Sequence, residues 1–349
     1  MRLLKWLFGI ALIFFTLAMV AHHWLRIGLL AFIASGVALI ALSKIMGDAT
    51  EQLSHRVGQN IAGFVNVTLG NLAELIVVYI LISQGMIDLV QANIVGSIFG
   101  NLLFVMGLSV LVGCWRHGTL PLNPFIVTLH ISQLFLVGLA LFLPTIVNAH
   151  LPEASQQAVS NRLAVLLVVV YIGSFFLFLK DKRLEKVKAM AAQLDQDWPL
   201  TLSLPALSIA AVATFFMGET LVAELEAFSI QFDLSRSFIG FIILPFLTNI
   251  AEHFSAIQSA WKNMPELSLA VAVGSATQVG MVVAPMAVVF GILTGHPMTL
   301  QFSQIPFAIL MASFIAAYIV LRDNQWNLTE GLMLLASYSA MVITFWYIQ

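Results

Sequence analysis

Long apolar segments constrain the fold of this chain more than any other feature of its sequence. Crossing a bilayer takes about 20 mostly apolar residues. Backbone polar groups in lipid must be satisfied within the segment, and these runs lack the alternation of barrel strands, so we expect helices. The sequence therefore predicts an all-α polytopic membrane protein with about 11 transmembrane helices. The eleven predicted segments are 5–22, 26–45, 58–83, 87–114, 123–148, 162–180, 199–220, 237–261, 267–294, 302–321 and 328–348.

The composition excludes several other classes of protein. The chain is 60% hydrophobic and 9% charged, whereas soluble domains are about 25% charged. Its net charge is -2 and it has no basic stripe, so we expect no nucleic-acid partner. Cys114 is the one cysteine, which excludes an intrachain disulfide and a multi-cysteine metal site. The first apolar block has no clear cleavage site, and we interpret it as a retained helix.

The basic residues predict how the chain is oriented. With the N-terminus in the cytoplasm, twelve of the fifteen lysines and arginines fall on the cytoplasmic side. Arg26, Arg162 and Arg236 are the exceptions. We therefore predict an integral protein of a bacterial inner (cell) membrane, with the N-terminus cytoplasmic and the C-terminus outside.

Two matching motifs divide the chain into repeats. Asn71-Leu72-Ala73-Glu74 is followed 22 residues after its glutamate by Gly96-Ser97, and Asn249-Ile250-Ala251-Glu252 is followed at the same distance by Gly274-Ser275. We predict a leading transmembrane helix (1–25), a first five-helix repeat (26–180), a cytoplasmic linker (181–198) and a second five-helix repeat (199–349). Because five is odd, the second repeat is inverted relative to the first. Inverted repeats are typical of secondary transporters, with the binding site near the bilayer midplane.

Glu74 and Glu252 are the only acidic residues deep inside predicted spans. A charge at the bilayer centre costs a few kcal/mol or more and usually has a function. The alternative is that each glutamate is protonated in a helix contact. Their repeat-equivalent positions and matched neighbours favour a shared ion site over that alternative.

The neighbours of these glutamates supply oxygen atoms. Asn71 and Glu74 are three residues apart and share a helix face, as do Asn249 and Glu252. Calcium takes six to eight oxygen ligands from carboxylates, amides, carbonyls and water. Taken singly, such polar residues more often form interhelical hydrogen bonds. Their repetition around two carboxylates favours ligands or supporting groups: Asn71, Asn249, Ser97, Ser275, Gln278 and Asn101.

Electrostatics then predicts coupled transport. Two carboxylates close together in a low dielectric cannot both ionise cheaply. A divalent cation or protons can neutralise them, so a site open to one side at a time gives antiport without a cofactor. The pair titrates jointly, so neither glutamate alone is the proton carrier. His253 adjoins Glu252 but points about 100° away around the helix; it either tunes the proton step or is a satisfied core histidine.

At these motifs the sequence resembles the cation/proton exchanger (CAX) branch of the cation/calcium exchanger superfamily. The similarity lies in residues 70–76 (GNLAELI) with 96–101 (GSIFGN), and in 249–253 (NIAEH) with 274–278 (GSATQ). The Glu252-His253 pair favours this branch. The resemblance implies eleven helices, one leading and ten in two inverted repeats. It also implies a cation between the two glutamates, bound with help from the backbone carbonyls near Gly70 and Thr248. Thr248 replaces the glycine usual in the family, and the linker is not strongly acidic.

The sequence thus predicts a secondary active antiporter that exchanges Ca²⁺, or a similar divalent cation, for H⁺ by alternating access. Its partners are the transported ions and the lipid bilayer, and an oligomer is possible. Alternatives within transport are a Na⁺-coupled calcium exchanger and a monovalent or Mn²⁺ cation–proton antiporter. A cation channel is a different class. An enzyme is not expected: no H-E-x-x-H motif is present, and by sequence Ser97 and Ser275 have no histidine partner in reach.

Overall fold

The computed structural model describes residues 2–56, 69–147, 151–180 and 198–347. In the first half of the chain the elements are α1 (Arg2–Val20), η1 (Ala21–Leu25), α2 (Gly28–Arg56), α4 (Leu72–Ser83), α5 (Ile87–Phe99), η2 (Gly100–Val105), α6 (Met106–His117), β1 (Leu120–Pro121), α7 (Pro124–Val147) and α8 (Glu153–Lys180). The η segments are π-helical turns.

The second half begins after the predicted linker, of which residues 181–197 lie outside the described residues. Its elements are α10 (Leu200–Ala223), α11 (Leu225–Phe232), α12 (Arg236–Phe238), η5 (Ile239–Ile243), α13 (Leu244–Thr248), α14 (Ile250–Trp261), α15 (Pro265–Gln278), η6 (Val279–Val283), α16 (Ala284–Thr294), α17 (Gln304–Leu321), β2 (Gln325–Trp326) and α18 (Leu328–Tyr347).

The prediction of an all-α membrane fold is confirmed. In the described part of the chain, nine helices are long and apolar enough to cross a bilayer, and each matches a predicted segment. The other two predicted segments, 58–83 and 237–261, contain the glutamates. Residues 57–68 of the first lie outside the described part, and the second is broken inside. The total of eleven helices stays a prediction.

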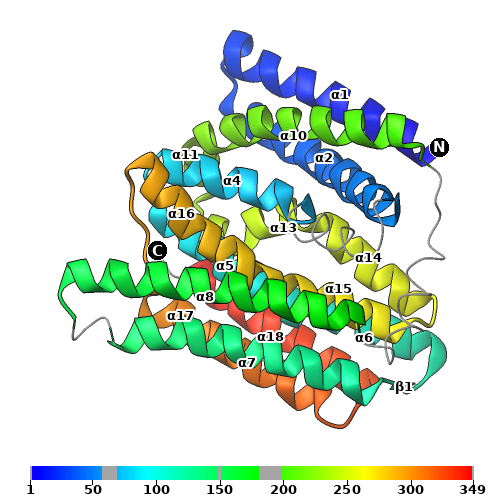
Figure 1. The fold of residues 1–349 in the computed structure, drawn as a ribbon. Coiled ribbons are helices and arrows are strands. Elements are labelled where there is room, and N and C mark those ends of the chain that lie inside the picture. The colour runs from blue at the N-terminus through cyan, green and yellow to red at the C-terminus, as the bar shows by residue number, and fades with distance from the viewer. Residues whose placement is uncertain (1, 57–68, 148–150, 181–197, 348–349) are drawn as a thin grey trace.

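The helices are arranged so that those with the motifs are enclosed. Figure 1 shows α1 on one outer side, beside α10 and α2, and α7, α8, α17 and α18 on the opposite side. The short helices α4, α13 and α14 lie between these groups with α5 and α15. Close packing of α2 on α10 and of α18 on α6 closes the bundle around them. The motif residues are therefore kept away from lipid.

One small departure from an all-helical fold joins two loops. Strands β1 and β2 pair antiparallel, with Leu120 opposite Trp326. The Cys114 thiol lies 3.3 Å from the carbonyl oxygen of Trp326, and both side chains are buried. Cys114 therefore packs beneath this strand pair.

Candidate functional site

Both N-x-A-E motifs begin a new helix immediately after a break. Asn71 (φ -98, ψ 22) precedes α4, and Asn249 (φ -108, ψ 12) precedes α14. Neither asparagine is helical, and each glutamate lies in the first turn of its short helix. The segment 237–261, predicted as one membrane span, is divided at Asn249.

The break changes the local electrostatics in favour of an ion site. The first turn of a helix has free N–H groups and a partial positive charge, which stabilise a nearby carboxylate. The last turn of α13, before the second motif, has carbonyls that no N–H of the same helix satisfies. In α13 the Thr248 hydroxyl lies 3.1 Å from the carbonyl oxygen of Leu244, and Asn249 Nδ2 donates to that of Pro245 at 3.0 Å.

Glu74 accepts hydrogen bonds from two donors of the first half, and the second half contacts one of these donors. It is 1% exposed, and its Oε1 accepts hydrogen bonds from the Ser97 hydroxyl and, at 3.4 Å, from Asn93 Nδ2. The Ser97 oxygen accepts in turn from Asn249 Nδ2 at 3.0 Å. A chain of hydrogen bonds thus runs from the second motif to the carboxylate of the first.

Two further hydrogen bonds cross between the motifs. Asn71 Nδ2 donates to Gln278 Oε1 at 2.6 Å, and Asn101 Nδ2 donates to the Ser275 hydroxyl at 3.2 Å. Each bond joins a residue of the first half to one of the second. The structure therefore brings the predicted side chains of the two motifs together in one buried site.

Glu252 is the acidic residue of the second motif. It is half-buried and lies in the first turn of α14, three residues after Asn249. Asn249 is linked to Glu74 through the Ser97 hydroxyl, so the two motifs adjoin. Among the described residues, the Oε2 atoms of Glu74 and Glu252 are buried and accept no hydrogen bond. Each half therefore offers one uncommitted carboxylate oxygen, the kind of ligand that a hard cation prefers.

The site is made of carboxylates and amides and contains no soft ligands. In the part of the chain that the structure describes, no three histidine, cysteine, aspartate or glutamate side chains gather in a metal-binding group. This composition suits Ca²⁺-like ions better than zinc or copper.

Glycine allows the two halves to approach closely beside the site. A Cβ on Gly96 would overlap the carbonyl oxygen of Phe241 and lie 2.7 Å from Cγ of Pro245. On the same face, a Cβ on Gly240 would lie 2.7 Å from that of Ala92. Helix α5 therefore packs directly on the backbone of η5, which sets the position of Ser97.

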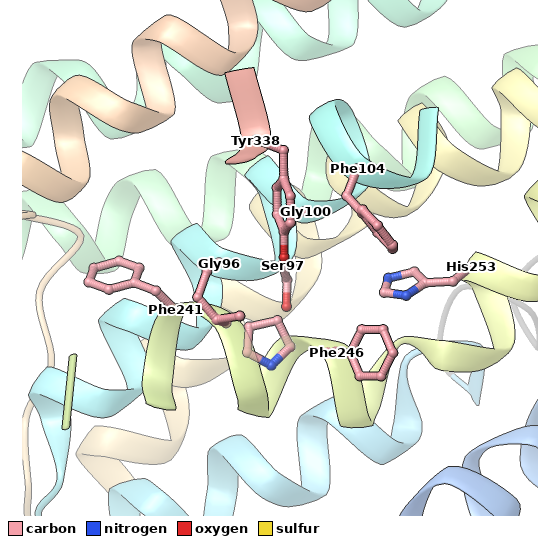
Figure 2. A pocket seen from close by; sticks show the side chains of 10 residues that line it. Gly96, Ser97, Gly100, Phe104, Phe241, Phe246, His253 and Tyr338 are labelled. Carbon is pink, nitrogen blue, oxygen red and sulfur yellow. The ribbon is translucent and has the colours of Figure 1, made fainter. Parts of the chain in front are cut away.

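A small cavity adjoins Ser97. Its volume is about 10 Å³, room for one water molecule. Figure 2 shows Tyr338, Phe104, His253 and Phe246 around it, with Ser97 at its centre. The remaining lining residues are Gly96, Gly100, Phe241, Ile242 and Pro245.

His253 is on the wall of this cavity, between the rings of Phe104 and Phe246. Its Nδ1 is buried and has no hydrogen-bond partner among the described residues. The structure thus places a histidine beside Ser97, which sequence spacing did not suggest. The Ser97 hydroxyl donates to Glu74, however, and is not arranged as a nucleophile.

One residue at the site was not among those predicted. Asn93 Nδ2 donates to Glu74. It had a sequence signal, since it lies four residues before Ser97 on the same helix face inside an apolar span.

Matched helix breaks that place a glutamate from each half at the centre of an apolar bundle define a membrane-embedded ion transporter. The chain matches the model of the sodium/calcium exchanger protein family over residues 27–180 and 202–347, and it belongs to that family.

Relatives and a solved structure match almost the whole chain. The Ca(2+)/H(+) antiporter of Aphanothece halophytica is 32% identical over 360 residues, with 97% of this chain and 96% of that protein covered. The Ca(2+)/H(+) antiporter ChaA of Bacillus subtilis (strain 168) is 32% identical over 333 residues, with 93% of each covered. The structure of native YfkE superimposes with a TM-score of 0.85 at 28% identity, covering 98% of this chain and 100% of that one. The resemblance to cation/proton exchangers is confirmed.

Proposed function

We propose that this protein is a secondary active antiporter that exchanges Ca²⁺, or a similar divalent cation, for H⁺. The observation that supports the proposal is the hydrogen-bonded link between the two motifs, in which Asn249 donates to the Ser97 hydroxyl and Ser97 donates to Glu74. The Oε2 atoms of Glu74 and Glu252 are buried without a hydrogen-bond partner among the described residues. The names of the two relatives at 32% identity support the same pair of ions.

The proposed mechanism is competition for two negative charges. In a low-dielectric site both carboxylates are stable only when their charge is neutralised. A divalent cation bound between them does this, and so do protons, but the two cannot be bound fully at the same time. The cation would be held by Glu74 and Glu252 with Asn71, Asn249, Ser97, Ser275, Gln278 and the carbonyls of Gly70 and Thr248. Asn101, which positions Ser275, and His253, beside Glu252, support this set.

Coupling requires that the site open to one side at a time. We propose that residues 26–180 and 199–349 are inverted five-helix repeats that move relative to each other, with 1–25 as a leading helix. The basic residues support a cytoplasmic N-terminus in an inner membrane.

Ion flux in everted membrane vesicles tests the proposal. Calcium added to vesicles with an acid interior should dissipate the pH gradient without sodium. Glu74→Gln and Glu252→Gln should each reduce this response to the background of empty vesicles while the protein still inserts. Glu226→Gln is the matched control, because the Glu226 side chain is 72% exposed and belongs to neither motif.

Other outcomes identify the alternatives. Calcium uptake driven by a sodium gradient alone would show a sodium-coupled exchanger. Calcium current without proton movement would show a channel. Full exchange in either glutamine variant would refute the two-glutamate site.

A further inference from the structure

A second cavity lies at the start of α5. Its volume is about 450 Å³, and Asp88, Ser237 and Gln304 are among the polar residues that line it. We call it the Asp88 cavity, and the small cavity beside Ser97 the Ser97 cavity. With the N-terminus in the cytoplasm, the fourth predicted segment, 87–114, starts on the outer side of the membrane. The Asp88 cavity therefore lies on the outer side in the proposed orientation.

A single face of α5 and η2 lines both cavities. Every fourth residue along it takes part: Asp88 and Ala92 line the Asp88 cavity, and Gly96, Gly100 and Phe104 line the Ser97 cavity. A spacing of four residues keeps to one face of a helix. The same face therefore leads from the outer cavity to the inner one.

Two further elements line both cavities in the same order. On α12, η5 and α13, Ser237 lines the Asp88 cavity, Pro245 lines the Ser97 cavity, and Phe241, four residues from each, lines both. On α18, Phe345 lines the first and Tyr338, two turns away, lines the second. Helix α18 packs on η2 and α12, and α5 packs on η5. The two cavities thus lie end to end in one seam between these helices.

A stacked pair of phenylalanines closes the seam between the two cavities. The rings of Phe241 and Phe345 lie 4.1 Å apart at an interplanar angle of 17°, and both side chains are at most 5% exposed. Figure 2 shows the Phe241 ring directed away from Ser97. The backbone carbonyl of Phe241 meets Gly96 on the other side. Phe241 therefore separates the cavities, with its ring toward Phe345 and its backbone toward Gly96.

The inner end of the seam suits a proton better than a cation. The Ser97 cavity has room for one water molecule, whereas Ca²⁺ takes about six to eight oxygen ligands. The Ser97 hydroxyl donates to Glu74 Oε1 and accepts from Asn249. Its second lone pair can accept a proton from water while its own proton passes to the carboxylate. Glu74 then gains the proton that water on the Asp88 side loses.

We propose that this seam conducts water and protons from the Asp88 cavity to Ser97 and Glu74, that the Phe241–Phe345 pair closes it in this structure, and that the divalent cation enters by another way. The role in proton movement rests on the proposed function. The closure by the Phe241–Phe345 pair does not, because it concerns access of water to Ser97.

The closure is tested with a thiol at Gly100, where a Cβ meets no atom within 4 Å. Gly100→Cys is made together with Cys114→Ser, and its reaction with a small membrane-impermeant thiol reagent is timed in right-side-out vesicles. Phe345→Ala should raise the reaction rate about tenfold or more, because losing a buried ring weakens the closed arrangement.

Phe32→Ala is the matched control for this rate. Phe32 is also buried and also stacks on a second ring, that of Phe228 at 4.0 Å, but it lines neither cavity. It should leave the rate at Gly100→Cys unchanged. An unchanged rate in Phe345→Ala, or an equal rise in Phe32→Ala, would overturn the closure.

The role in proton movement is tested by blocking the outer cavity. Ser237→Cys, a substitution of similar size, is labelled in right-side-out vesicles with a bulky impermeant maleimide, and the purified labelled protein is reconstituted into liposomes. Calcium–proton exchange should fall to the background of empty liposomes, whereas exchange of Ca²⁺ for Ca²⁺ at equal pH should continue. Labelled Gln231→Cys, at an exposed residue that lines neither cavity, should keep both activities.

The other outcomes are equally clear. Undiminished calcium–proton exchange in labelled Ser237→Cys would overturn the proton route. Loss of both exchange modes would overturn the separation of the proton from the cation. Wild-type protein with no calcium–proton exchange would instead refute the proposed function, and the reaction rates at Gly100→Cys would still decide whether the Phe241–Phe345 pair closes the seam.

Discussion

Gly96→Ala should lower both the stability and the transport rate of this protein, because Gly96 lies where α5 packs closely on η5. The added methyl group would lie 2.7 Å from Cγ of Pro245 and 2.8 Å from the carbonyl carbon of Phe241. Carbon atoms pack best at about 3.5–4.0 Å, so α5 and η5 must separate by on the order of 1 Å. Overpacking of this kind costs about 1–3 kcal/mol.

Gly100→Ala is the matched control, one helical turn further along the same continuous segment. A Cβ at Gly100 meets no atom within 4 Å. Both variants gain the roughly 1 kcal/mol by which alanine exceeds glycine in helix propensity, so this gain cancels in the comparison. The difference between them isolates the cost of the crossing.

The assay is denaturation of both purified variants in one detergent, with calcium-driven flux measured in parallel. We expect Gly96→Ala to be less stable than Gly100→Ala by about 1–3 kcal/mol. We also expect its initial flux to fall on the order of tenfold or more, since shifts of 1 Å can cost an active site about a hundredfold. If the two variants have equal stability and equal flux, the close packing of α5 on η5 does not position Ser97.

Three other variants test single contacts. Thr248→Gly removes the hydroxyl that lies 3.3 Å from Asn249 Nδ2 and should raise the KM for Ca²⁺ about two- to fivefold. Thr248→Ser keeps a hydroxyl, and its KM should stay near the wild-type value. Equal KM values for the two variants would show that the hydroxyl does not contribute to Ca²⁺ binding. His253→Phe should alter the pH profile of exchange while Ca²⁺ binding to purified protein is retained, and an unaltered profile would assign His253 to packing. Ser97→Ala should reduce exchange more than Asn93→Leu, since Ser97 is the closer of the two donors to the same carboxylate; the reverse order in vesicle flux would contradict this.

Hydropathy was sufficient to predict most spans but not their ends or breaks. The predicted segment 26–45 extends to Arg56 in α2. Lys44 and Asp48 pair at 2.5 Å across one helical turn, so these charges do not end the helix. Pro245, one turn before Asn249, predicts a kink in the segment 237–261, and the structure divides the helix at Asn249. Hydropathy measures solvent preference, and it does not detect a local change of backbone direction.

The members of the site were predictable, but their partners were not. Asn101 lies four residues after Ser97, but it bonds to Ser275 of the second half. Gln278 lies three residues after Ser275, but it bonds to Asn71 of the first half. Spacing along a helix shows which residues share a face. It does not show which face of another helix they meet, and these pairings depend on how the two halves cross.

The cross-half pairing has a consequence for alternating access. The hydrogen bonds from Asn71 to Gln278, Asn101 to Ser275 and Asn249 to Ser97 all join the two halves. At about 0.5–1.5 kcal/mol each they amount to roughly 2–4 kcal/mol, which is the size of the gap between the conformations of a typical two-state protein. In the proposed mechanism, a cation that draws these amide and hydroxyl oxygens to itself would compete with the bonds that hold the halves in this arrangement. Ion binding and the relative movement of the halves would then act on the same atoms, and no separate gate would be needed to couple them.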